Sequence, residues 1–119
     1  MSNKRAAKAD VLQGTLDLMV LQTLSALGAL HGYAISARLE QASNGAIQLN
    51  MGTLYPALMR LEQRGLVRGD WRVTETSRRA RYYTITAAGR RQLAVKHAEW
   101  DQMAAIIHTL RHRRTRSTG

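Results

Sequence analysis

The chain has 119 residues, 45% of them hydrophobic, with no cysteine and a formal net charge of +10. This length supports one modest core, the missing cysteines exclude disulfides and thiolate metal sites, and no apolar run reaches the roughly 20 residues of a membrane helix. We therefore expect a one-domain cytoplasmic protein, and the large positive charge indicates an anionic partner such as nucleic acid.

The N-terminal part of the chain predicts an arm followed by two helices. Residues 1–11 are polar and basic without periodicity, as in a flexible arm. From Thr15, apolar residues recur at helical spacing on a stripe broad enough for burial on more than one side, until Gly28 ends this helix. A second, amphipathic helix begins after His31 and stops at the Asn44-Gly45 turn.

A third helix is predicted after a very short strand formed by residues 47–49. Residues 50–53 supply capping side chains for this helix, and Pro56 is expected in its first turn. Leucines at helical spacing form the inner face, and Gly65 ends the helix just after its C-cap. The inward residues are Leu54, Leu58 and Leu61.

After the third helix, the period of the pattern changes from helical to strand-like. Residues 66–73 and 80–85 predict two strands joined by an arginine-rich loop over residues 74–79. Tyr83 and Ile85 are expected to share the inner face of this hairpin, because side chains alternate along a strand. The excess of positive charge lies mostly in this C-terminal half, in the loop and near the chain end.

Thr86 is a candidate N-cap for a long final helix that continues to about Leu110. Its apolar residues follow the three- and four-residue steps of a helix seam, so we expect the helix to dimerise, with packing on its own domain as the alternative. With two residues of the first helix, the predicted interface comprises Leu16, Met19, Leu93, Trp100, Met103, Ile107 and Leu110. Residues 111–119 have no apolar content and predict a disordered basic tail.

The sequence offers no convergent set of catalytic or metal-binding residues. His108 and His112 have the spacing of a metal-binding pair on a helix, but no carboxylate or third ligand is in register with them. The chain also contains no phosphate-binding loop, nucleophile elbow or carboxylate pair. We therefore expect a protein that is not an enzyme and that requires neither a metal nor a cofactor.

The predicted order of elements, mainly α with a small β-hairpin, is that of a winged helix-turn-helix followed by a long helix. Particular segments are more specific: LQGTLDL (residues 12–18), LHGYAI (30–35), GTLYPALMRLE (52–62) and RARYYTITAAG (79–89). Together they resemble the PadR family of transcriptional regulators, from about residue 12 to residue 110.

The resemblance implies a winged helix-turn-helix over residues 12–85, a dimerisation helix over residues 86–110, and a homodimer that binds double-stranded DNA and usually acts as a repressor. The single last helix is similar to the short subfamily, which lacks a longer helical extension for ligands. A dedicated small-molecule domain is therefore not expected, and the existence of an inducer is left open.

Candidate DNA contacts lie on the third helix and the hairpin. The helix start presents N–H groups that favour phosphate. The arginines on the loop tip are candidates for phosphate or minor-groove contacts, because they gain most from a nearby anion. Several candidates have structural alternatives: Tyr55 as a brace and Tyr33 at the core edge. Arg60 can instead pair with Glu62 or face solvent, and Arg79 or Arg81 can stack on an aromatic ring. The predicted set is Tyr33, Asn50, Met51, Gly52, Thr53, Tyr55, Arg60, Arg78, Arg79 and Arg81.

Two other functions are left open by the sequence. The same fold can serve as a protein-interaction adaptor whose basic residues only keep it soluble, and salt-sensitive binding to duplex DNA would exclude this. An RNA-binding role is less favoured, because the chain has no phenylalanine and few aromatic residues on which bases can stack.

Overall fold

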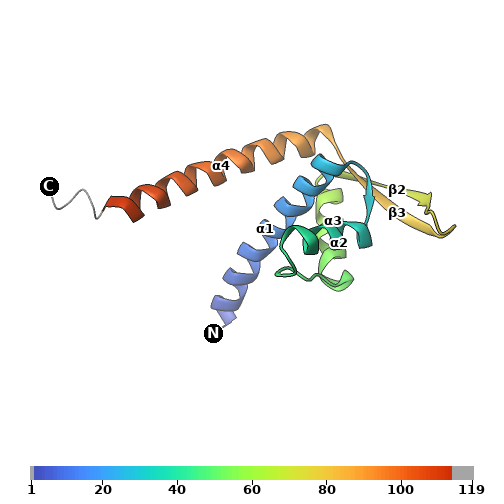
Figure 1. Cartoon of the computed structure of the whole chain (residues 1–119), viewed down its shortest axis with the longest axis horizontal. Helices are drawn as coiled ribbons and strands as arrows, with labels where there is room; N and C mark the ends of the chain where they lie inside the picture. The colour runs from blue at the N-terminus through green and yellow to red at the C-terminus, as the bar shows by residue number, and fades with distance from the viewer. Residues whose placement is uncertain (1, 114–119) are drawn as a thin grey trace.

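A computed structural model describes the backbone of residues 2–113 and the side chains of residues 14–113. The β2–β3 hairpin projects from the helices as a wing, and α1 and α4 diverge on the other side (Figure 1). This is the predicted winged helix-turn-helix with a long last helix. Its elements are α1 (Ser2–Leu27), β1 (Leu30–His31), α2 (Gly32–Ala42), α3 (Met51–Gln63), β2 (Val67–Val73), β3 (Arg79–Ile85) and α4 (Ala87–His112).

The three strands form an antiparallel sheet in the order β1-β3-β2. β2 and β3 pair along their whole length, with Val67 opposite Ile85 and Gly69 opposite Tyr83. Val67, Tyr83 and Ile85 are buried on the face that meets the helices, which confirms the predicted inner face of the hairpin. The same face continues beyond the helices toward the wing tip, where it is exposed.

One apolar core joins α1, α2, α3 and the base of the wing. Val20 and Leu24 of α1 are completely buried at its centre, as expected for a helix with a broad apolar stripe. The predicted inward leucines of α3, Leu54, Leu58 and Leu61, are also completely buried. Burial of each such side chain stabilises the fold by about 1.5–3 kcal/mol, so the core fixes the orientation of α3.

Polar side chains cap α3 and α4 as predicted. Asn50 Oδ1 accepts a hydrogen bond of 2.9 Å from the Thr53 N–H, and Thr86 Oγ1 accepts one of 3.0 Å from the Gly89 N–H. Gly65 ends α3 with a φ of 72°, which glycine adopts without the steric penalty of a side chain. These caps define where α3 and α4 begin and where α3 ends.

The first helix begins earlier than predicted. α1 starts at Ser2, so residues 2–11 form its first turns and the prediction of a flexible arm is wrong for them. Alanine, lysine and arginine dominate this stretch and are strong helix formers, so α1 extends through it without an apolar stripe. Periodicity alone therefore missed this part of the helix.

Two predictions around α3 are also wrong. Residues 47–49 form no strand; their backbone is an irregular connection from which Ile47 and Leu49 pack against the core. The third strand of the sheet is β1, which pairs with β3 instead. Pro56 lies in the second turn of α3, not the first, where its missing N–H leaves only the Gly52 carbonyl without its helical donor.

α4 continues to His112, two residues beyond the predicted end. All its residues from His97 onward are exposed, as is Arg113. The rest of the predicted basic tail, residues 114–119, lies outside the described residues. Within the described part of the chain, no helix is both long enough and apolar enough to cross a bilayer.

Candidate nucleic-acid interface

The side of α3 opposite the core is open at its N-terminal end. Gly52, Thr53 and Tyr55 are exposed there, followed one turn later by Met59. Asn50 is exposed too, but its side-chain oxygen is occupied by the cap of α3. Asn50 therefore holds the helix start, and the small residues that follow leave the backbone accessible.

The start of α3 packs closely against the start of α2. A Cβ atom at Gly32 would lie 3.4 Å from Met51 Sδ and 3.8 Å from the Tyr55 ring. Tyr33, which follows Gly32, is 69% exposed. The predicted residues Tyr33, Met51 and Tyr55 are thus brought together at the neighbouring N-terminal ends of α2 and α3.

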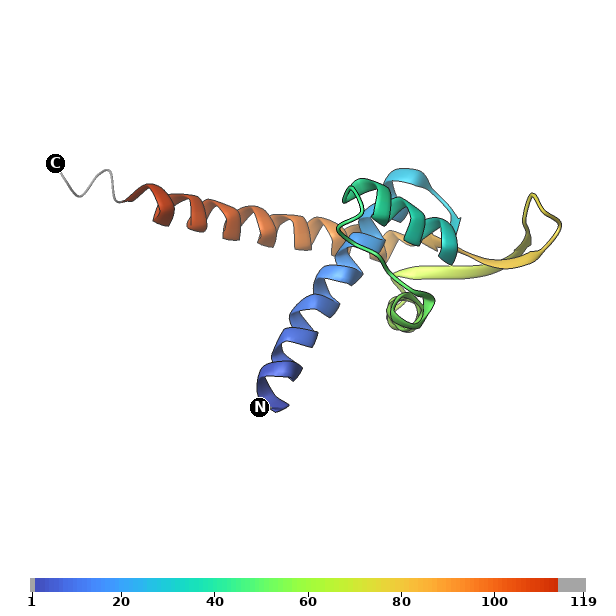
Figure 2. The ribbon, with the colours of Figure 1, turned by 60° about the horizontal axis from the view of Figure 1, so that its bottom comes forward.

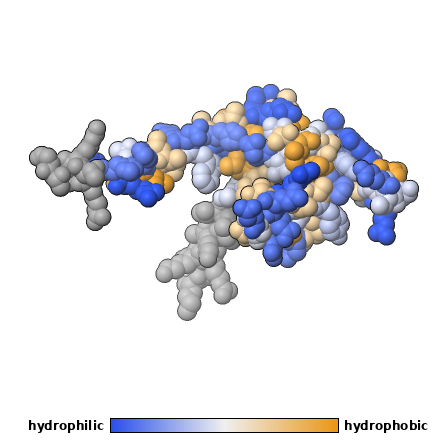
Figure 3. Space-filling view, in the orientation of Figure 1, coloured by the Kyte–Doolittle hydropathy of each residue, from blue (hydrophilic) through white to orange (hydrophobic). Residues whose placement is uncertain are grey.

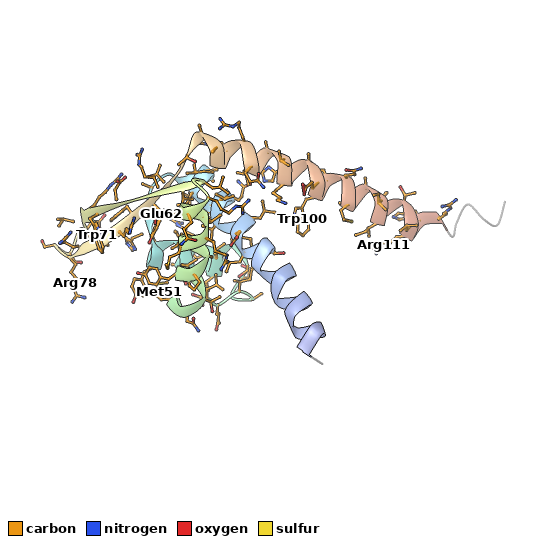
Figure 4. The ribbon with its side chains drawn as sticks, turned by 180° about the vertical axis from the view of Figure 1, so that it is seen from behind. Met51, Glu62, Trp71, Arg78, Trp100 and Arg111 are labelled. Carbon is orange, nitrogen blue, oxygen red and sulfur yellow. The ribbon has the colours of Figure 1, made fainter. Side chains whose placement is uncertain are left out.

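The loop at the wing tip is held by hydrogen bonds to Thr74. The Thr74 N–H donates to the Arg78 carbonyl at 2.7 Å, and Thr74 Oγ1 accepts from the Arg78 N–H at 3.2 Å. The Arg78 side chain projects from the tip into solvent (Figure 4). A surface depression of about 540 Å³ separates this loop from α2, and Tyr33, Arg78 and Arg79 line it.

Arg81 is used inside the molecule, between the wing and α3. Its guanidinium forms an ion pair with Glu62 of α3 and lies 6.0 Å from the centre of the Tyr83 ring. Gly69 permits this path, because a Cβ atom there would overlap the Arg81 guanidinium. Burial raises the pKa of the Tyr83 phenol above its ordinary value, and the positive charge of Arg81 partly opposes this shift.

Arg60 is used inside the molecule as well. Its guanidinium donates to Asp17 Oδ1 at 2.9 Å and joins α3 to α1. Asp17 is only 14% exposed, which strengthens the pair relative to a fully solvated one. Arg60 is therefore ion-paired, but with Asp17 and not with the predicted Glu62, which pairs with Arg81 instead. The DNA contacts of Arg60 and Arg81 stay predictions. Both residues fix the position of α3.

Arg79 stays near the wing surface but is stacked. Its guanidinium lies 5.1 Å from the centre of the Trp71 ring. On the opposite face of the hairpin, Arg72 lies 5.3 Å from the centre of the Tyr82 ring. The predicted set did not include Trp71 or Arg72. The signal for Trp71 was an aromatic residue next to Arg72 in a predicted strand, beyond the positions expected to be buried.

The predicted dimer interface divides into two groups. Leu16 and Leu93 are buried in the core of the subunit itself, so their prediction as interface residues is wrong, and Met19 packs partly against that core. The residues farther along α4 are exposed by 50–59% of their surface: Trp100, Met103, Ile107 and Leu110. Figure 3 shows apolar areas along α4 among hydrophilic ones.

Two shallow hollows lie where α1 and α4 diverge. They have volumes of about 330 and 460 Å³, and Leu18 and Trp100 line both. The rings of His108 and His112 lie on exposed helix surface, tilted by 51° to each other with their centres 4.3 Å apart. In the described part of the chain, no three histidine, cysteine, aspartate or glutamate residues gather closely enough to hold a metal ion.

Comparison of the sequence with known proteins identifies related proteins and one matching family. The model of the transcriptional regulator PadR-like family matches residues 20–95. An uncharacterised 37.1 kDa protein in transposon Tn4556 of Streptomyces fradiae is 47% identical over 66 residues. That match covers 56% of this chain but only 17% of the Streptomyces protein, so the two correspond over a small part of that relative.

Several solved structures have the same fold. A transcriptional regulator from Clostridium thermocellum is 31% identical, with a TM-score of 0.73 over 84% of this chain and 93% of the other. A PadR family regulator from Eggerthella lenta is 27% identical, with a TM-score of 0.67 over 94% and 97%. A PadR-like transcription factor from Bacteroides fragilis, at 23% identity, has a TM-score of 0.77 over 88% and 98%.

Proposed function

Because this chain belongs to the PadR-like family of transcriptional regulators, we propose that it is a homodimeric, cytoplasmic repressor that recognises a specific double-stranded DNA sequence. Family membership makes it a DNA-binding transcription regulator and not an enzyme. The observation that supports the finer proposal is the convergence of the open N-terminal end of α3 with the exposed arginines of the wing.

In this proposal α3 enters the major groove by its N-terminal end. Thr53 supplies a hydroxyl for a base edge, Met51 supplies an apolar contact, and Gly52 adds no side chain that would hold the helix away from the DNA. The N–H groups of the first turn and the helix dipole attract a phosphate beside the groove. Tyr33 and Tyr55 flank this point and can donate to the backbone.

The wing supplies affinity that does not depend on sequence. Arg78 and Arg79 carry two positive charges to the end of a rigid hairpin beside α3, where phosphates of the same duplex are expected. Arg60 and Arg81 contribute indirectly, because their ion pairs to Asp17 and Glu62 fix α3 relative to α1 and the wing.

The exposed residues of α4 favour a homodimer. Trp100, Met103 and Ile107 follow one side of a helix whose residues from His97 to His112 are all exposed in the described subunit. A second copy placed there by a two-fold axis would bury both sets of side chains at once. The two copies of α3 would then meet successive turns of the major groove.

Duplex binding at several salt concentrations tests the proposal. The protein should bind selected duplexes with an affinity that falls steeply with salt, and Arg78→Ala with Arg79→Ala should weaken selected and random duplexes alike and reduce the salt slope by roughly one contact per arginine. Arg91→Ala with Arg111→Ala is the charge-matched control on exposed residues of α4. A wild-type protein that binds no duplex would contradict the proposal and favour an adaptor role.

A further inference from the structure

An aromatic and apolar patch lies on the wing beyond the reach of α3. Trp71 and Val73 are two residues apart on β2, so they share a face, and they are 60% and 68% exposed. This is the face whose inner part, at Val67 and Tyr83, is buried under the helices. Figure 3 shows an apolar area at the wing end.

The patch carries a cation in a fixed place. Arg81 lies opposite Trp71 in the register, and Arg79 is its diagonal neighbour, whose guanidinium stacks at 5.1 Å from the indole centre. Stacking on the indole leaves the outward N–H groups of Arg79 available while it removes much of the side chain's rotational freedom. The surface therefore combines a flat apolar centre with a positive edge.

The patch is also held at a defined position relative to α3. The Glu62–Arg81 ion pair joins the end of α3 to the strand pair directly beside Trp71. Figure 2 looks along α3 and shows the sheet beside it, with the hairpin extending outward. A duplex that receives the N-terminal end of α3 in its major groove would therefore meet this face of the wing at an adjacent groove.

We propose that Trp71 and Val73 form an apolar wedge that enters the minor groove next to the site of α3, with Arg79 at its edge bonding the phosphates. This inference rests on the proposed function, which assigns the wing only phosphate affinity. The minor groove suits the patch because its walls are apolar sugar rings between two rows of phosphates, and proteins that bind there combine arginine with apolar wedges. Arg78 at the wing tip adds positive charge beside the patch, and Glu75 is the acid of the wing loop.

A wedge in the minor groove would make the wing a determinant of sequence. Guanine places an amino group in the minor groove, and A·T pairs do not. The protein should therefore bind more tightly to duplexes that have A·T pairs under the wing, even though α3 does not contact these pairs. We therefore expect a stretch of A·T pairs that flanks the α3 site to be the binding partner of this patch.

Tryptophan emission tests the contact directly, since Trp71 and Trp100 are the two tryptophans of the chain. In the Trp100→Phe variant, Trp71 is the sole reporter, and its emission should be strongly quenched or shifted when a selected duplex is added. The Trp71→Phe variant, which keeps Trp100 on α4, is the matched control and should change little. Binding itself is followed separately by the anisotropy of a labelled duplex.

Inosine substitution tests the groove. G·C pairs under the wing should weaken wild-type binding roughly tenfold, and inosine in place of guanine should restore it, because inosine lacks only the minor-groove amino group. The Trp71→Ala variant should bind both flanks equally and keep the unfolding midpoint of the wild type, since Trp71 is exposed. A duplex that binds without changing Trp71 emission, or a Trp71→Ala variant that still discriminates, would overturn the wedge and leave the proposed function intact. Absence of any duplex binding would overturn both.

Discussion

Gly69 and Arg81 together decide how the wing is held. The Arg81 guanidinium crosses directly over Gly69 to reach Glu62, and any side chain at residue 69 would occupy its path. The pair is about one-third exposed at both ends, so its contribution to stability is small, about 0–1 kcal/mol. Its importance lies in orientation, because it connects α3 with the strand that bears the wing.

We predict that Gly69→Ala weakens specific DNA binding several-fold with little change in the free energy of unfolding. The new Cβ displaces Arg81 from Glu62, so the wing and α3 no longer present one rigid surface. Affinity for a selected duplex and a thermal unfolding midpoint measure the two effects.

Glu62→Arg combined with Arg81→Glu is the control for this prediction. The exchange restores an ion pair with reversed polarity, so it should recover much of the affinity that Glu62→Arg alone loses. If Gly69→Ala binds DNA like the wild type, the pair does not orient the wing.

The site was only partly predictable from the sequence, because the sequence does not show which arginines form ion pairs within the fold. Composition places positive charge on the hairpin and α3, but it does not tell which guanidinium meets an acid from elsewhere in the fold. Arg60 is paired with Asp17, 43 residues earlier in the chain. Arg81 is paired with Glu62, and the packing of α3 against the sheet brings them together. Pairing partners distant in sequence are fixed by packing and not by local pattern.

At the level of elements, the wing and α4 pack closely at their junction. Gly89 lies in the first turn of α4, and a Cβ atom there would overlap the Leu66 carbonyl and the Ile85 side chain. Thr86, which caps the same turn, also donates from its hydroxyl to the Gly65 carbonyl at 2.7 Å. The TAAG segment (residues 86–89) is therefore explained by close packing at this junction.

We predict that Gly89→Ala destabilises the protein by about 3 kcal/mol or more, because a methyl group would have to displace backbone at residue 66. Gly14→Ala is the matched control: Gly14 lies within α1 with open space around its Cα, so the same change should stabilise by roughly 0.5–1 kcal/mol. Denaturant unfolding measures both variants. Equal effects of the two changes would contradict the close contact at Gly89.

The elements themselves were largely predictable, because their boundaries are encoded locally. Asn50 and Thr86 cap the helices that follow them, and Gly65 ends α3 with a left-handed backbone. The strand β1 was not predictable, since two residues carry no alternation and pair only because β3 lies beside them. The N-terminal extension of α1 was missed because helix propensity, and not an apolar stripe, supports it.

For the whole molecule, the exposed apolar side of α4 is the proposed seam of the homodimer. We predict that Trp100→Asp with Ile107→Asp converts a dimer into a monomer, because two charges would be buried without partners at the proposed seam. Both residues are about half exposed in the subunit, so its own core should survive. Ala98→Asp with Thr109→Asp places the same charge on the other side of α4 and should leave the dimer intact. Light scattering that shows a dimer of the first variant, or a monomeric wild type, would contradict the seam.

The final prediction joins the dimer to DNA recognition. Two copies of α3 related by a two-fold axis reach the same side of a duplex only when the half-sites are separated by about one helical turn, roughly 10 base pairs. Insertion of five base pairs at the centre of a selected site turns one half-site to the opposite side of the duplex and should reduce affinity toward that of random DNA. The monomeric Trp100→Asp, Ile107→Asp variant should bind weakly but with no dependence on this insertion, since each subunit then binds one half-site alone. Equal sensitivity of wild type and monomer to the insertion would show that a single subunit reads the whole site, through α3 and the wing together.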